Sequence, residues 1–105
     1  MNTIAILTNE HKFLDISVNL ARISDWIFSD NSRRQQRVDQ FLEEIQEYIE
    51  TIHKDALSSR FRSTYQQFEI EFTKLLKERS TSNKADWAER ALTWANILQH
   101  RAKLA

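Results

Sequence analysis

The stretch ILTNEHKFLDISVNLARISDWIF, residues 6–28, determines the fold class. Apolar side chains recur in it every seven residues in two registers, and isoleucines fill the positions between them. The registers are Ile6, Phe13, Leu20 and Ile27, then Leu7, Leu14, Ala21 and Phe28, with Ile16 and Ile23 between. This spacing predicts an amphipathic α-helix with a wide apolar stripe. Thr3 and Thr8 are both suitable N-caps. We expect the earlier start, near Thr3, because Ile6 and Leu7 keep the phase of the stripe.

Three further segments have helical periodicity. The four predicted helices cover residues 3–28, 33–54, 59–79 and 84–103. The polar stretches SDNS (29–32), KDALSS (54–59) and RSTSN (79–83) separate them, and Ser32, Ser58 or Ser59, and Asn83 are the candidate N-caps. The middle break contains Ala56 and Leu57, which are good helix formers. One continuous helix over residues 33–79, about 70 Å long, is therefore the alternative, and it would need a second chain to cover it, as in a swapped dimer.

The absence of glycine and proline also indicates helices. The 105 residues contain neither, although average usage is about 7% and 5%. Tight β-hairpins generally need Gly or Asn at positive φ. We therefore predict an all-α chain, a single domain over residues 1–105, folded as an antiparallel up-down-up-down four-helix bundle.

Composition excludes several kinds of function. Without cysteine there is no disulfide, thiol nucleophile or thiolate metal site. Without glycine a phosphate-binding loop or a nucleophile elbow is not expected. No apolar run is long enough for a membrane span and no signal peptide is evident, so we expect a cytoplasmic protein without membrane contact. The 15 basic and 15 acidic residues balance, which disfavours a general nucleic-acid binder.

One end of the predicted bundle combines basic and aromatic residues. It gathers the ends of the first and third helices and the starts of the second and fourth. The candidate partner-binding residues there are Trp26, Arg33, Arg34, Arg37, Lys77, Arg79, Lys84 and Trp87. Such a surface suits an acidic protein partner or the phosphates of a nucleic acid. The competing interpretation is intramolecular: Arg33 and Arg34 pair with Asp30, and Trp26 packs as a lid over the core.

The three histidines, His11, His53 and His100, are predicted to lie at the opposite end of the bundle. Three imidazoles could hold zinc, but His53 and His100 share their heptad positions with polar, outward residues, so no metal site is assigned. The heptapeptide His53–Ser59 resembles the motif of histidine phosphotransfer domains. That motif has Lys three residues after the histidine and then Gly, where this chain has Ala56 and Leu57.

No Ser–His–Asp pattern is recognisable, so neither catalytic residues nor a cofactor are predicted. The sequence therefore favours a non-enzymatic helical bundle that acts through protein–protein contacts, including contacts with a second copy of itself as a homodimer. The alternatives are nucleic-acid binding through the basic end and histidine phosphotransfer through His53.

Overall fold

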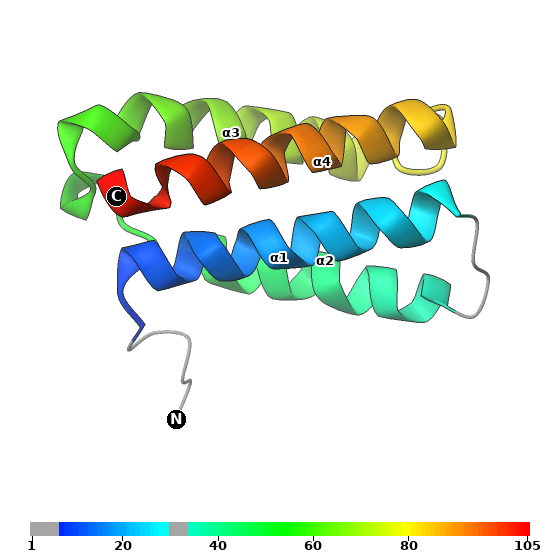
Figure 1. Ribbon diagram of the computed structural model, residues 1–105, viewed down its shortest axis with the longest axis horizontal. Coiled ribbons are helices and arrows are strands. Elements are labelled where there is room, and N and C mark those ends of the chain that lie inside the picture. The colour runs from blue at the N-terminus through cyan, green and yellow to red at the C-terminus, as the bar shows by residue number, and fades with distance from the viewer. Residues whose placement is uncertain (1–6, 30–33) are drawn as a thin grey trace.

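The computed structural model describes residues 7–29 and 34–105 and confirms the predicted four-helix bundle (Figure 1). Consecutive helices run in opposite directions, and the described residues contain no β-strand. The α-helices are α1 (Asn9–Phe28), α2 (Gln35–Glu50), α3 (Ser59–Glu78) and α4 (Lys84–Arg101), and the 3-10 helices are η3 (Lys54–Ala56) and η4 (Ala102–Leu104). Within the described part of the chain, no helix is both long and apolar enough to cross a bilayer.

The first helix begins later than its apolar periodicity predicted. Thr8 has an extended backbone (φ −66°, ψ 158°), and its side chain accepts a hydrogen bond from the His11 amide. A threonine that caps in this way ends the helix on its N-terminal side, whatever the phase of the preceding apolar residues. The expected start near Thr3 is therefore wrong for Leu7 and Thr8, which are not helical. Thr3 and Ile6 lie outside the described residues.

The connection between α2 and α3 is a real break, so the alternative of one helix over residues 33–79 is wrong. α2 ends at Glu50, four residues before the predicted end. His53, Leu57 and Ser58 all have extended backbones on either side of η3. The Leu57 side chain is 3% exposed and packs into the core. Leu57 thus anchors the connection, which explains why so apolar a residue occurs between two helices.

The predicted N-caps of the three later helices had different outcomes. Asn83 caps α4, and its side chain accepts a hydrogen bond from the Asp86 amide at 3.1 Å. Ser58 is the N-cap residue of α3 but makes no capping bond; its hydroxyl donates to the carbonyl of Leu104 instead. Ser32, the predicted cap of the second helix, lies outside the described residues, and the N-cap position of α2 is held by Arg34 without a side-chain bond.

All four helices contribute to one buried cluster. At the end where α1 begins, the Phe13 ring lies 4.5 Å from Phe61 and 5.5 Å from Tyr65, so α1 and α3 touch across the bundle. At the other end Trp87 is 1% exposed, and its indole N–H donates to the carbonyl of Leu75 at 2.8 Å. Aromatic residues therefore fill both ends of the core.

The two seams that α4 forms differ in width. Against α1 it packs more closely than any other pair of helices in the structure. Ser17 and Ser24 donate hydrogen bonds from α1 to the α4 carbonyls of Ala95 and Ala88, at 2.8 and 2.6 Å. Against α3, α4 has fewer backbone neighbours. Small residues allow α1 and α4 to approach closely, because little side-chain bulk separates their two backbones.

Burial also governs the polar contacts between α1 and α2. The Tyr48 hydroxyl donates to Asp15 Oδ2 at 2.7 Å. Burial raises the pKa of Tyr48 above its ordinary value, and the hydrogen bond to Asp15 and the charge of that carboxylate add to the effect. Tyr48 therefore stays protonated, and keeps donating to Asp15, to a higher pH than an ordinary tyrosine.

Candidate functional site

The predicted basic and aromatic end exists, but much of it is satisfied within the chain. The guanidinium carbon of Arg34 lies 5.5 Å from the centre of the Trp26 ring. Trp26 also stacks on the ring of Phe41, with 5.2 Å between the ring centres, and packs against the core. Trp26 is only partly exposed. This arrangement is the predicted lid over the core, and Arg34 covers the lid through a cation–π contact, which is worth about 0.5–1 kcal/mol at exposed sites.

Three other residues of the predicted surface come together at a small hollow. Arg79, Lys84 and Trp87 line a cavity of about 210 Å³. Arg79 forms an ion pair with Asp39 at 2.9 Å and lies 3.5 Å from Gln35 Oε1. Trp87, named from the sequence as a partner-binding residue, is 1% exposed and belongs to the core, so most of its side chain is withdrawn from this surface. Its periodic position on α4 had already indicated burial.

The remaining predicted residues are dispersed. Lys77 lines a different hollow on the outer side of α3, together with Lys74 and Ile70. Arg37 is exposed on α2 and has no ion-pair partner within the described residues. Arg33 and Asp30, which were expected to pair, lie outside the described part of the chain. The predicted surface is thus divided between an internally paired cluster and isolated cations.

The histidines do not form a centre. Among the described residues there is no group of three His, Cys, Asp or Glu side chains placed to hold a metal ion. The His11 ring lies 3.0 Å from the Thr8 hydroxyl, beside the cap of α1. His53 has an extended backbone between α2 and η3. The sequence predicted His53 on the helix over 33–54, and this prediction is wrong. The segment that resembles a phosphotransfer motif therefore does not begin on a helix, as that resemblance requires.

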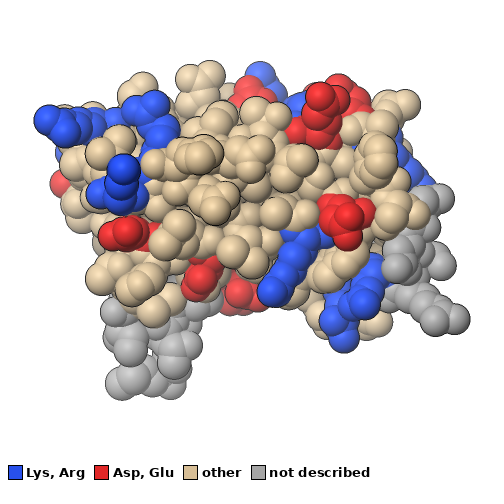
Figure 2. Space-filling view, viewed as in Figure 1, with Lys and Arg blue, Asp and Glu red and all other residues tan. Residues whose placement is uncertain are grey.

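A stronger candidate surface lies where α1 and α4 face outward together. Four side chains from each helix line a groove of about 440 Å³: Ala21, Ser24, Asp25 and Phe28 from α1, and Ala85, Ala88, Glu89 and Leu92 from α4. Phe28 is 71% exposed and Leu92 is 43% exposed. Figure 2 shows this face, with uncharged side chains across its middle and most charged ones toward its ends and edges. Apolar surface concentrated in this way marks contact sites.

The close seam between the helices creates the groove. Ala88 and Ser24 meet at its floor, where the Ser24 hydroxyl donates to the Ala88 carbonyl. Because these side chains are small, the outward side chains one turn away stand above them as two banks. Val18, one turn before Ala21, extends the apolar surface and is 47% exposed. The groove therefore follows from the same small residues that bring α1 and α4 together.

One carboxylate stands on each bank. Asp25 comes from α1 and Glu89 from α4, and both side chains are exposed. Neither carboxylate has a hydrogen-bond or ion-pair partner in the part of the chain that the structure describes. The groove thus combines an apolar floor with unneutralised negative charge on both sides.

The sequence contained a signal for this groove, but it was assigned to the core. Phe28 and Ala21 belong to the second seven-residue register of the first helix. That register lies at the edge of the apolar stripe and turns partly outward, since a stripe of this width exceeds what three neighbouring helices cover. A stripe wider than the core requires is a usable sign of a contact surface.

No protein-family model matches the chain, and no curated protein or solved structure matches it.

Proposed function

We propose that this protein is a non-enzymatic binding module that recognises an amphipathic helix of another protein in the groove between α1 and α4. The observation that carries the proposal is the exposure of Phe28 and Leu92 beside a floor of small residues. Helices bind such grooves by inserting apolar side chains at i, i+3, i+4 and i+7. Burial of each large apolar side chain contributes about 1.5–3 kcal/mol.

Charge complementarity selects the kind of helix. Asp25 and Glu89 flank the apolar floor on opposite sides, and neither carboxylate has a partner among residues 7–29 and 34–105. Lysine or arginine residues beside the apolar anchors of a partner would lie against them. A second copy of this chain is less suitable, because an isologous contact places the same patch on both subunits. The carboxylates of both copies would then lie in one interface, and the lining of the groove contains no Lys or Arg to neutralise them.

The groove between α1 and α4, and not the basic end, is the principal contact surface in this proposal. Arg79 there is neutralised by Asp39, and Arg34 is engaged by Trp26. Nucleic-acid binding through the same arginines is the less favoured alternative for this reason. Its signature would be binding that weakens steeply with salt, since phosphate contacts release counterions. An aromatic-anchored protein contact weakens only slightly.

The test uses two synthetic helical peptides with identical leucine and phenylalanine anchors. One carries lysines beside the anchors and the other carries glutamates. We expect the lysine peptide to bind the full chain at least about tenfold more tightly, because charge pairs at a partly desolvated site contribute on the order of 1.4 kcal/mol or more. Fluorescence anisotropy of labelled peptides measures both affinities.

Matched variants assign the contact to the groove. Leu92→Ser should abolish binding, and Asp25→Asn combined with Glu89→Gln should remove the preference between the peptides. Ile70→Ser is the control, because Ile70 is 59% exposed but lies on α3. Equal affinity for the two peptides, or no binding of either, contradicts the proposal. So does a dimer in sedimentation analysis that Leu92→Ser dissolves, because the occupant would then be a second copy.

A further inference from the structure

A second groove lies between α3 and α4, on the other side of α4 from the proposed helix-binding face. This open groove has a volume of about 760 Å³, within the roughly 300–1,000 Å³ of small-molecule sites. From α3 it is lined by Ser63, Thr64 and Gln67, and from α4 by Thr93, Trp94, Asn96, Ile97, His100 and Arg101. Aromatic bulk opens it, since Trp94 lies between the helices and its ring is 5.7 Å from that of Phe68.

The charge of this groove is one-sided. Its lining contains Arg101 and His100 but neither Asp nor Glu. The surrounding sequence agrees: residues 56–68 and 90–105 contain no acidic side chain, although the chain as a whole is neutral. Arg60 and Lys103 add positive charge to the same end of the bundle. The side chains that line the groove therefore place no carboxylate against a bound anion, and Glu89, one turn before Thr93 on α4, belongs to the lining of the other groove.

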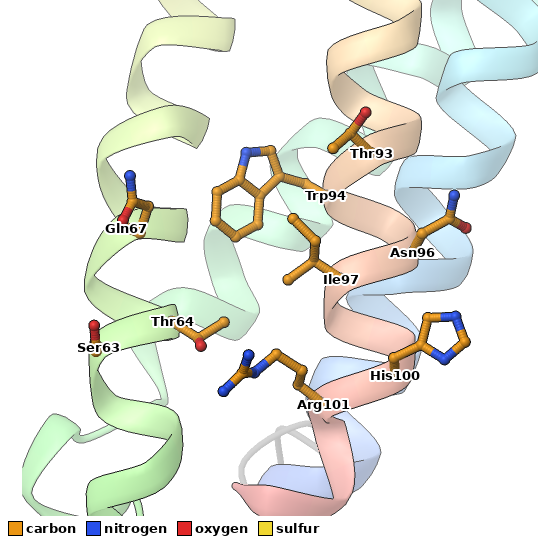
Figure 3. A pocket seen from close by; sticks show the side chains of 9 residues that line it. All are labelled: Ser63, Thr64, Gln67, Thr93, Trp94, Asn96, Ile97, His100 and Arg101. Carbon is orange, nitrogen blue, oxygen red and sulfur yellow. The ribbon is translucent and has the colours of Figure 1, made fainter.

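The side chains are arranged for a ligand with two different parts. Figure 3 shows the Arg101 guanidinium directed from α4 into the space beside Thr64 of α3. Within the described residues Arg101 has no ion-pair or hydrogen-bond partner. Two turns earlier, the Trp94 indole reaches toward α3, and Ile97 fills the interval. His100 and Asn96 point away from α3 and stand at the rim.

The spacing of three side chains along α4 indicates the size and chemistry of the ligand that fits. Trp94, Ile97 and Arg101 follow one another at i, i+3 and i+7, so they share one face of α4 and span about 10 Å along its axis. A planar ring fits the aromatic and apolar half, and an anionic group fits the guanidinium, which binds carboxylate or phosphate in a bidentate manner. Thr64 lines the groove opposite Arg101, and its hydroxyl is the kind of donor that the same anionic group accepts.

We infer that the groove between α3 and α4 is a binding site for a small aromatic anion, with the ring on Trp94 and Ile97 and the anionic group on Arg101 and Thr64. The inference is independent of the proposed helix-binding function, because the two grooves share no lining residue. Neither site needs the other to be occupied.

The test compares three probes by NMR titration of the isotope-labelled full chain. Indole-3-acetate carries both parts, tryptamine has the same ring with a positive charge, and inorganic phosphate is an anion without a ring. We expect indole-3-acetate to bind most tightly and to shift the amide signals of residues 63–67 and 93–101. Similar affinity for indole-3-acetate and tryptamine, stronger binding of phosphate, signal shifts confined to the other groove, or no binding at millimolar concentration would each overturn the inference.

Variants separate a specific site from a general basic field. Arg101→Gln should weaken indole-3-acetate binding about tenfold, the loss expected of a charge-assisted hydrogen bond. Lys103→Gln removes the same charge from an exposed residue that does not line the groove, and binding should be unchanged. Equal losses in the two variants would contradict the site. Leu92→Ser, which disrupts the helix-binding groove, should leave indole-3-acetate binding intact, so failure of one proposal is distinguishable from failure of the other.

Discussion

The two seams that α4 forms, with α1 and with α3, show how side-chain size sets helix spacing and thereby the position of grooves. Ala88 and Ala95 face Ser24 and Ser17 of α1, and the hydroxyls bond directly to the opposing backbone. On the α3 side, the first turn of α4 inserts the buried Trp87 and a later turn carries the half-buried Trp94. The seam with α1 is closed at its floor and exposes a groove above it, whereas the seam with α3 is wider and holds the groove lined by Trp94, Ile97 and Arg101.

The largest expected effect tests whether the α3–α4 seam is tight only at the start of α4. Trp87→Ala removes a side chain that is 1% exposed and donates to the Leu75 carbonyl. It should lower the free energy of unfolding by about 3–5 kcal/mol. Trp94→Ala should cost only about 1–2 kcal/mol, because that ring already borders an open groove. Urea denaturation measures both values. Equal losses would mean that the seam is equally well packed along its length.

The sequence was sufficient to predict the helices and their order, because the stripe of α1 and the absence of glycine and proline both favour one fold class. It did not determine where helices end. Thr8 and Thr3 are equivalent caps by composition, and only the backbone at Thr8 distinguishes them. The end of α2 depends on the burial of Leu57, which is a tertiary contact. Local propensity does not report such contacts.

The candidate sites were harder to predict than the fold. The basic end was identified by counting charges, but pairing cancels part of it, and Arg79 with Asp39 is the clearest case. Neither residue reveals the other in the sequence, because they lie 40 positions apart, Asp39 on α2 and Arg79 directly after the end of α3. The acid-free stretches 56–68 and 90–105 were equally visible in the sequence, and the inferred anion site between α3 and α4 depends on them. Their meaning depends on the juxtaposition of α3 and α4, which periodicity alone does not give.

The next prediction asks whether close approach is what holds α1 against α4. Ala95 is 2% exposed, and its carbonyl accepts the Ser17 hydroxyl. Ala95→Leu should lower the free energy of unfolding by about 1–3 kcal/mol, because added bulk forces the backbones apart. Thr93→Leu, two residues earlier on the exposed α3 side of α4, should change it by less than about 0.5 kcal/mol. Thermal unfolding followed by circular dichroism compares the two. If Ala95→Leu leaves the free energy of unfolding unchanged, the interface between α1 and α4 has space for the larger side chain.

The smallest effect concerns the hydroxyl groups themselves. Ser24→Ala removes the buried bond to the Ala88 carbonyl and should cost about 1 kcal/mol. Ser63 lies exposed on α3 in the open groove, so Ser63→Ala should be close to neutral. Chemical denaturation measures the free energy of unfolding of both variants. Because each variant loses one hydroxyl group, the difference between the two losses reports the effect of burying the hydrogen bond. If the two losses are alike, α1 and α4 are held together by the packing of their alanines alone. The serines would then be present because they are small, and the groove above them would not depend on the hydrogen bonds.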